Sequence, residues 1–183
     1  GWGLGPERLC AANAGLIFAR ISGFGQTGPY ASRPGYASVC EAFGGLRHLT
    51  GNPGEVPVRA NLSLGDSLAG LHAVLGILLA LEARRQSGRG QVVDASIFES
   101  VFNVLESVVP EFDRAGAERG PSGPTVSGIV PSNAYPTAGG EWVVIGANNS
   151  ANFRRLMLAI GRHDLAADPE LEGNPGRLRR QGE

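Results

Sequence analysis

One carboxylate in the sequence stands in a position suited to covalent chemistry. Asp66 lies in the segment Leu64-Gly65-Asp66-Ser67-Leu68-Ala69-Gly70, where a long apolar helical pattern begins. The backbone N–H groups of a helix's first turn have no partner inside the helix, and together with the helix dipole they favour a charged carboxylate. An ionised carboxylate can attack an acyl group as a nucleophile. Asp66 is therefore the first candidate for a catalytic residue.

The same pattern also fits a structural role for Asp66. Ser63 is a favourable N-cap residue, and Asp66, three positions later, could return the hydrogen bond in a capping box, for which Glu is the more usual partner. Taken alone, the pattern favours the capping box over catalysis.

The elements around Asp66 follow a layered α/β pattern. The apolar run over residues 15–22 predicts a buried strand, and the alternation over residues 91–98 predicts a second one. Helices are expected over residues 6–13, 36–46, 65–86 and 99–109. The helix over residues 65–86 is apolar on nearly every side, so we expect it to be buried between layers.

The second half of the chain has a different composition. Residues 110–128 are rich in proline and glycine and predict a linker. A β-hairpin over residues 132–146 and a helix over 149–160 are expected after it. We divide the chain into an α/β portion, residues 1–109, the linker 110–128, and an α+β portion, residues 129–183.

The composition excludes several classes of partner. The 183 residues include 16 basic and 17 acidic side chains, and a net charge of -1 lacks the basic footprint of a protein that binds nucleic acid or anionic membranes. The two cysteines have neither metal-ligand spacing nor a disulfide framework, so no metal is expected. No signal peptide and no apolar stretch of spanning length is recognised, which predicts a cytoplasmic protein without membrane contact. Both ends are interpreted as cuts through a longer protein.

Several motifs occur in a characteristic order along the chain. They are residues 16–30 (LIFARISGFGQTGPY), Gly35-Tyr36, Leu64-Gly65-Asp66, residues 89–94 (RGQVVD), residues 131–137 (PSNAYPT) and residues 142–149 (WVVIGANN). In this order the chain resembles the family III CoA-transferases of the CaiB/BaiF type, a group that includes formyl-CoA transferase and α-methylacyl-CoA racemase. The resemblance implies part of a Rossmann-like large domain, a linker and the start of a small α+β domain.

The resemblance also implies a reaction. Asp66 matches the family's nucleophile, which takes the acyl group of a donor thioester as a mixed anhydride and then carries CoA as an aspartyl-CoA thioester. The acceptor acid reverses these steps. CoA and acyl-CoA are then substrates, and no permanently bound cofactor is implied. The expected partners are an acyl-CoA, with succinyl-CoA as the candidate donor, and small carboxylic acids.

Further candidates for the substrate and CoA site follow from the resemblance. Tyr36 stands where racemase-like members carry a His-Asp pair, and the resemblance places it beside Asp66. A tyrosine is a poor general base at neutral pH, which favours acyl transfer over racemisation. Gly65 and Gly70 would let a thioester approach without a Cβ in the way, or would serve close helix packing. Gln26, in the loop after the first strand, could face CoA or substrate.

The segment around Gly128 bears on the substrate. Formyl-CoA transferase has a run of glycines there, and Gly128 is the candidate that remains in this chain, which weighs against formyl or oxalyl substrates. Residues 127–149 are closer to the succinyl-CoA:glutarate type. A racemase-like enzyme and a catalytically silent, truncated CoA-binding or interaction protein remain as alternatives. The family forms interlocked homodimers, and we expect the present chain alone to be inactive and to bind CoA poorly.

Overall fold

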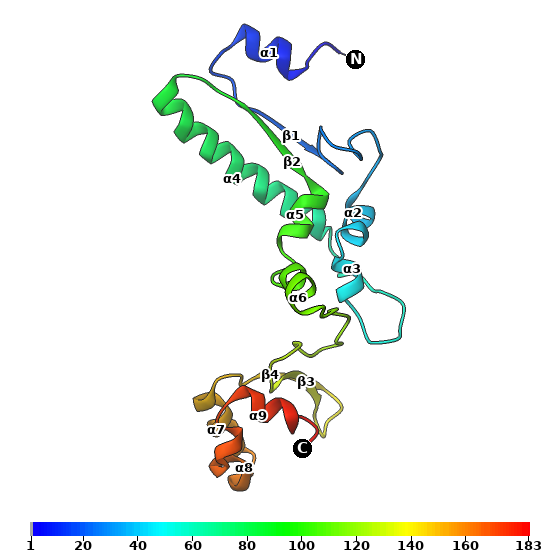
Figure 1. Cartoon of the computed structure of the whole chain (residues 1–183), viewed down its shortest axis with the longest axis vertical. Coiled ribbons are helices and arrows are strands. Elements are labelled where there is room, and N and C mark those ends of the chain that lie inside the picture. Colours follow the sequence, from blue (N-terminus) through cyan, green and yellow to red (C-terminus); the bar gives the residue numbers. More distant parts are fainter. Residues whose placement is uncertain (1) are drawn as a thin grey trace. The chain divides into compact units, whose positions relative to one another are not determined.

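The computed structural model describes residues 2–183, which form two compact units. The first contains the chain up to Thr50 together with Pro57–Gly120, and the second contains Gly51–Val56 and Pro121–Glu183. The first unit combines a parallel strand pair with helices, and the second combines an antiparallel hairpin with helices (Figure 1). The expected mixture of an α/β portion followed by an α+β portion is confirmed.

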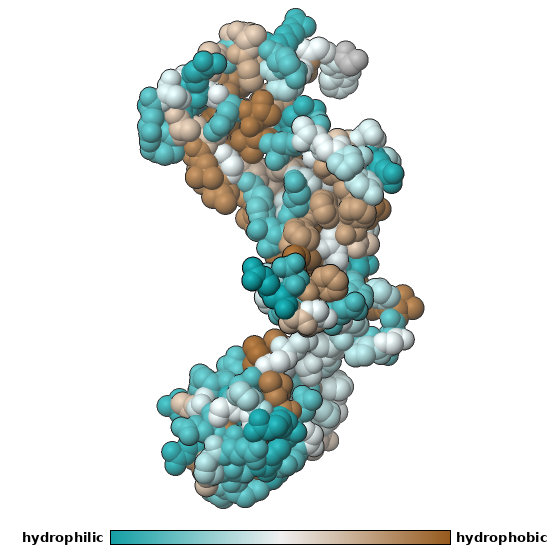
Figure 2. Space-filling model, viewed as in Figure 1, coloured by the Kyte–Doolittle hydropathy of each residue, from teal (hydrophilic) through white to brown (hydrophobic). Residues whose placement is uncertain are grey.

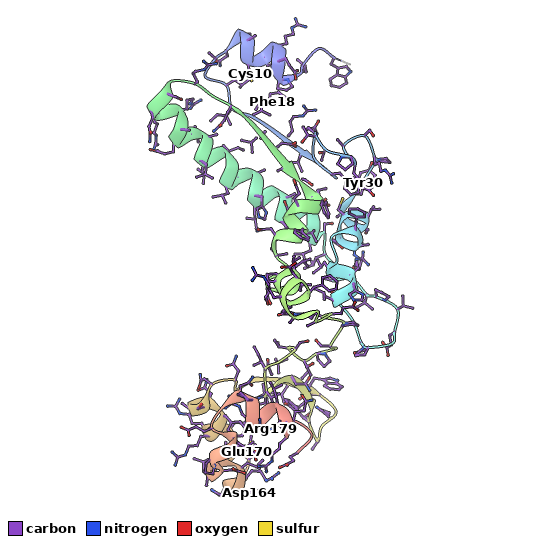
Figure 3. All side chains as sticks on the ribbon, viewed as in Figure 1. Cys10, Phe18, Tyr30, Asp164, Glu170 and Arg179 are labelled. Carbon is purple, nitrogen blue, oxygen red and sulfur yellow. The ribbon has the colours of Figure 1, made fainter. Side chains whose placement is uncertain are left out.

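A short parallel sheet forms the centre of the first unit. Strand β1 (Phe18–Ser22) pairs with β2 (Val92–Ser96), and Phe18 stands opposite Val92. Figure 3 marks Phe18 at the start of β1. The strand begins later than residue 15 because the Leu16 N–H turns back to the Asn13 carbonyl at 3.0 Å. Both strands occur where the apolar patterns predict them.

Six helices accompany this sheet. They are α1 (Pro6–Ala12), α2 (Ala37–Phe43), α3 (Leu46–Leu49), α4 (Leu64–Ser87), α5 (Ile97–Asn103) and α6 (Val108–Ala115). The expected helix over residues 36–46 is divided into α2 and α3 at Gly45, which has a φ of 94°. The expected helix over 99–109 ends at Asn103, because Glu106 adopts a φ of 53°.

Helix α6 extends into the segment that the sequence predicts as a linker. Its third residue is Pro110, and a proline in the first helical turn is tolerated because the missing N–H has no partner there anyway. Arg119 donates to Glu111 and Glu106 and so ties the following residues back to α6. Proline content alone is therefore a poor indicator of a linker at this point.

Helix α4 packs against the sheet through small residues. Gly65, Ala69, Ala73 and Ala80 are buried along one side, and a Cβ at Gly76 would come within 2.6 Å of Val93 Cγ1. Figure 1 shows α4 running along β1 and β2. The expected end of the helix is confirmed, since Gly88 adopts a φ of 72° and donates its N–H to the Arg84 carbonyl at 2.8 Å.

The other side of α4 is exposed, so the prediction of a helix buried all round is wrong for this chain. Leu71 is 68% exposed and Leu79 is 63% exposed, and brown, hydrophobic surface follows the helix in Figure 2. Burial on all sides needs a layer on each face of the helix. Residues 2–183 provide only the layer of the sheet and its neighbouring helices.

By length and composition alone α4 could cross a membrane, contrary to the expectation that no stretch is long and apolar enough. One such helix is weak evidence, because core helices of soluble domains pass the same test. Here α4 contacts β1, β2, α2 and α5 of its own unit on one side, and 22% of its apolar window is buried.

The second unit is built on the predicted hairpin. Strands β3 (Ser132–Pro136) and β4 (Trp142–Gly146) are antiparallel, with Ser132 opposite Gly146. Helix α7 (Ser150–Ala159), α8 (His163–Ala167), the short 3-10 helix η1 (Pro169–Leu171) and α9 (Asn174–Arg179) follow. Their core consists of Phe153, Met157, Leu165 and Leu171. On the surface Arg179 donates to Glu170 at 2.8 Å, and both are labelled in Figure 3.

Candidate functional site

Asp66 occupies the first turn of α4, and its side chain is exposed. Within residues 2–183 the carboxylate has neither a hydrogen-bond partner nor an ion-pair partner. An exposed carboxylate that supports no local structure is free to meet a substrate. This is the arrangement that nucleophilic chemistry at Asp66 requires.

The capping box favoured by the pattern is not formed, so that interpretation is wrong. Ser63 occupies the N-cap position but its side chain accepts no hydrogen bond from the first turn. The hydroxyl of Ser67 instead donates to the Ser63 carbonyl at 3.0 Å. Ser63 has backbone angles of φ -81° and ψ 65°, outside the extended region in which an N-cap side chain reaches the N–H groups ahead of it.

A buried carboxylate from another helix takes over part of the capping. Glu41, in α2, is 2% exposed, and its Oε1 accepts the Gly65 N–H at 3.0 Å. Its Oε2 accepts from Arg47 Nε at 3.1 Å. Arg47 thereby neutralises the charge of Glu41. The sequence analysis missed Glu41, although a single carboxylate in the otherwise apolar stretch 37–43 is a usable signal.

The carbonyl of Gly23 joins three elements at the carboxyl edge of the sheet. It accepts from Cys40 Sγ at 3.3 Å, from Ser96 Oγ at 3.3 Å and from the Phe98 N–H at 3.0 Å. The end of β1, the end of β2 and helix α2 are thereby fixed to one another. Ligands of α/β sheets bind at this edge.

The pKa of Cys40 depends on the charges at this edge. The thiol is fully buried, and burial raises its pKa above the ordinary value. The negative charge of Asp66 and, to a smaller extent, that of Glu41 raise the pKa further, so both carboxylates act on the same small region. Cys40 is a free thiol, as is the half-exposed Cys10.

Gln26 lies in the loop after β1, as predicted, and its polar groups hold that loop. Its backbone N–H donates to Asp94 Oδ2 at 2.7 Å, and its side-chain Nε2 donates to Ser22 Oγ at 3.0 Å. Tyr30 closes the loop against aromatic side chains, at 5.0 Å from the ring of Phe43 (Figure 3).

Tyr36 and Asp66 lie at the amino ends of two helices in contact. Tyr36 is the N-cap residue of α2, and its carbonyl accepts the Cys40 N–H at 3.0 Å. Its side chain is 85% exposed. Helix α2 packs against α4, so both side chains extend from the same pair of helices.

The two candidate glycines of α4 have different surroundings. A Cβ at Gly65 would lie 3.1 Å from Ile97 Cγ2 and 3.4 Å from Glu41, which is close packing. A Cβ at Gly70 would meet no atom within 4 Å. Gly70 follows Asp66 by four residues and shares its side of the helix. Open space beside Asp66 is thus found at Gly70.

The remaining candidates have structural partners. His72, in α4, is hydrogen-bonded to the Leu68 carbonyl at 2.8 Å and to Asn103 Nδ2 at 3.1 Å, which gives it a structural role. Gly128 belongs to the second unit, where its carbonyl accepts from Asn174 Nδ2 at 2.7 Å. Across residues 2–183 no group of three or more His, Cys, Asp or Glu side chains is arranged to hold a metal ion.

The large cavities are lined by the second unit. Their volumes are about 580 and 430 Å³. Beside the smaller one, Arg177 is buried with its guanidinium 5.0 Å from the ring of Phe153, and Nη2 donates to the Asn148 carbonyl at 2.9 Å. Burial lowers the pKa of Arg177. This arginine supports the core of the second unit.

Comparison with known proteins agrees with this geometry. The family model described as CoA-transferase family III matches residues 1–183, and the chain belongs to this family. Succinyl-CoA–D-citramalate CoA-transferase from Chloroflexus aurantiacus is 49% identical over 182 residues, which are 100% of this chain and 45% of that protein. The alpha subunit of succinyl-CoA–L-malate CoA-transferase from the same organism is 42% identical over 94% of this chain and 40% of its own length. Succinyl-CoA:glutarate CoA-transferase from Mus musculus is 31% identical over 99% of this chain and 41% of that protein.

Solved structures share the fold. A CAIB/BAIF family protein from Brucella suis matches with a TM-score of 0.79 and 32% identity, covering 98% of this chain and 47% of that one. Rv3272 from M. tuberculosis matches with a TM-score of 0.82 and 27% identity, covering 98% and 47%. The chain therefore spans less than half the length of these relatives.

Proposed function

We propose that this chain carries the nucleophile of a CoA-transferase that moves CoA from succinyl-CoA to a small dicarboxylic acid, with Asp66 as the nucleophile. The observation that carries the proposal is the exposed carboxylate of Asp66 in the first turn of α4, unpaired within residues 2–183. Membership of family III supports the class of reaction.

The first half-reaction loads CoA onto the enzyme. A carboxylate oxygen of Asp66 attacks the thioester carbonyl carbon of succinyl-CoA, the C–S bond breaks, and CoA leaves as a thiolate. The product is a mixed anhydride of succinate and Asp66. The thiolate then attacks the Asp66 carbonyl carbon of the anhydride, which forms an aspartyl-CoA thioester and releases succinate. No proton is gained or lost overall.

The second half-reaction runs the same steps in reverse. A carboxylate of the acceptor attacks the carbonyl carbon of the aspartyl-CoA thioester and displaces CoA thiolate, giving a second mixed anhydride. The thiolate attacks the acceptor's acyl carbon, which yields the new acyl-CoA and free Asp66. The open space at Gly70 would admit the thioester, and the exposed Tyr36 and the loop around Gln26 would line the same region. Gly128 stays a candidate that rests on the resemblance alone.

The relatives support the proposed substrates. Their names pair succinyl-CoA with D-citramalate, L-malate or glutarate, all of which are dicarboxylic acids. A hydroxydicarboxylic acid is the acceptor we favour, because the relatives at 49% and 42% identity are named for such acids. This chain spans less than half the length of each of these relatives. For the full-length protein we propose a cytoplasmic, interlocked homodimer without resident cofactor. This chain alone would be inactive.

Trapping of the intermediate tests the proposal. The full-length protein is incubated with succinyl-CoA, treated with hydroxylamine or borohydride, digested and mapped by mass spectrometry. We expect a modification at Asp66 that is absent without donor and absent in Asp66→Asn. An Asp66→Ala enzyme that still transfers CoA would disprove the nucleophile assignment. Inversion at the acyl α-carbon without transfer would identify a racemase, and no adduct with any of several donors would indicate a silent CoA-binding protein.

A further inference from the structure

We propose that Glu41 is a positioning residue for Asp66, because its buried carboxylate holds the start of α4 in place from helix α2. The inference rests on the proposed function, in which Asp66 is the nucleophile. It concerns the neighbour Gly65, whose N–H donates to Glu41 Oε1 at 3.0 Å over a separation of 24 residues. Gly65 directly precedes Asp66, so this bond fixes the backbone on which Asp66 stands.

Helix α4 depends on this contact because its own N-cap is not used. Helix α5 is capped locally by Ser96, which accepts the Glu99 N–H at 3.2 Å, and α7 is capped by Asn149, which accepts the Asn152 N–H at 2.8 Å. The N-cap Ser63 of α4 makes no such bond. The free N–H groups of a helix's first turn need acceptors, and Glu41 supplies one from outside the helix.

Both oxygens of the Glu41 carboxylate accept hydrogen bonds, as a buried charge requires. Glu41 is 2% exposed, and Oε2 accepts from Arg47 Nε at 3.1 Å. A buried carboxylate without partners is strongly unfavourable, so Glu41 has no alternative arrangement of similar energy. Arg47 also offsets the charge of Glu41 and so limits its repulsion of Asp66.

The packing around Gly65 adds precision to the contact. A Cβ at Gly65 would lie 3.4 Å from both Cγ and Oε1 of Glu41 and 3.1 Å from Ile97 Cγ2. Helices α2 and α4 thus approach each other closely at this point. Tyr36 is the N-cap residue of α2 and Asp66 lies in the first turn of α4, so the contact joins the two helices that carry these candidate site residues.

Glu41 itself does not touch substrate, because both its oxygens are engaged and it is buried. Its loss should therefore affect the rate of the chemical steps more than the binding of acyl-CoA. A displacement of about 1 Å of a reacting group can cost about 10²-fold in rate. An amide at position 41 keeps an oxygen for the Gly65 N–H, whereas an aliphatic side chain does not.

The test compares three variants of the full-length protein. Glu41→Leu should lower kcat by about 10²-fold with KM for succinyl-CoA nearly unchanged, whereas Glu41→Gln should stay within about tenfold of wild type. Glu82→Gln, which breaks the exposed ion pair with Arg85 at the other end of α4, is the matched control and should leave kcat unchanged. An unchanged kcat in Glu41→Leu, or equal losses in the Leu and Gln variants, would overturn the inference.

Hydrogen exchange provides a test that does not depend on the folding of a variant. The Gly65 amide of the wild-type protein should be protected, unlike other amides of the first turn of an uncapped helix. Rapid exchange at Gly65 would overturn the inference. Asp66→Ala is assayed in parallel: retained transfer there would refute the proposed function, whereas loss of transfer there with no effect of Glu41→Leu would refute only the positioning role.

Discussion

The carboxylate of Asp94 accepts the backbone N–H of Gln26 at 2.7 Å, although 68 residues separate them. Asp94 lies in β2, and Gln26 lies in the loop that leaves β1. The two strands are paired, so the bond extends their connection beyond the last ladder position, Ser22 opposite Ser96. A candidate substrate loop is thereby tied to the sheet by a charged acceptor.

Removal of this acceptor should loosen the loop. Asp94→Ala is expected to reduce the free energy of unfolding by about 1 kcal/mol and to increase hydrogen exchange at Gln26, because a bond to a charged group is lost. Asp94→Asn keeps a carbonyl oxygen and should have a smaller effect. Equal exchange at Gln26 in wild type and Asp94→Ala would show that the loop is held by other contacts.

Two glycines of α4 should respond in opposite ways to alanine. Alanine favours a helix over glycine by about 1 kcal/mol, so Gly70→Ala, with open space at its Cβ, should stabilise the chain. Gly76→Ala places a methyl group 2.6 Å from Val93 Cγ1 and should destabilise by about 1–3 kcal/mol.

The Gly76 effect has an internal control. Val93→Ala removes the methyl groups that a Cβ at position 76 would meet, so the double variant should lose less stability than the two single changes predict together. The measurement is thermal or urea unfolding of all four proteins. Strict additivity would mean that α4 and β2 are further apart than described.

Aspartate substitutions should distinguish the two sides of α4. Leu75 is 54% exposed and Ala73 is 4% exposed. Leu75→Asp should therefore leave the 183-residue chain folded, whereas Ala73→Asp should stop the chain from folding, so that no cooperative melting transition is seen. Circular dichroism and melting curves provide the measurement. A helix buried on nearly every side, as its apolar pattern alone predicts, would instead fail to fold with a charge at Leu75. Loss of folding in Leu75→Asp would indicate that this side is covered.

The buried thiol of Cys40 predicts a pH dependence. Its pKa is raised above 9.0, so the folded state holds the proton more tightly than the unfolded state does. The contribution of the protonated Cys40 thiol to the free energy of unfolding is fully present below about pH 9. It is lost as the pH rises through the pKa of the folded state. In the native protein at pH 8, alkylation should reach the half-exposed Cys10 well before Cys40.

The contribution of Cys40 can be isolated with Cys40→Ala. This variant should be less stable at neutral pH because it leaves a cavity, but its stability should fall less between pH 9 and pH 11 than that of wild type. Parallel curves for the two proteins would show that the thiol does not titrate differently in the folded state.

Local sequence patterns predict the helices and strands of this fold better than they predict which residues pack against them. The strands, the hairpin, the Gly88 cap and the position of Asp66 in a first helical turn all follow from residue order, because each depends on near neighbours. The Glu41 cap could not be predicted in this way, since its partner lies 24 residues further along the chain. Asp94 likewise gives no local sign of its bond to Gln26.

The errors have physical causes of the same kind. The apolar pattern of α4 indicates which residues prefer burial but not whether a second layer is present to bury them. The capping box at Ser63 fails because the backbone there turns away from the extended conformation that this motif needs. The motifs at Asp66, Tyr36 and Gln26 indicate the family, which the comparison over residues 1–183 confirms.

The small residues along α4 give the helix a mechanical property. A helix that rests on a sheet through glycine and alanine lies close to it, so a larger side chain in this contact has to displace the helix itself. Gly76 and Asp66 are ten residues apart, about 15 Å along the helix axis. A bulky replacement at Gly76 would push this part of α4 away from β2 and tilt the end of the helix that carries Asp66. Activity could thus be tuned by substitutions that no substrate touches.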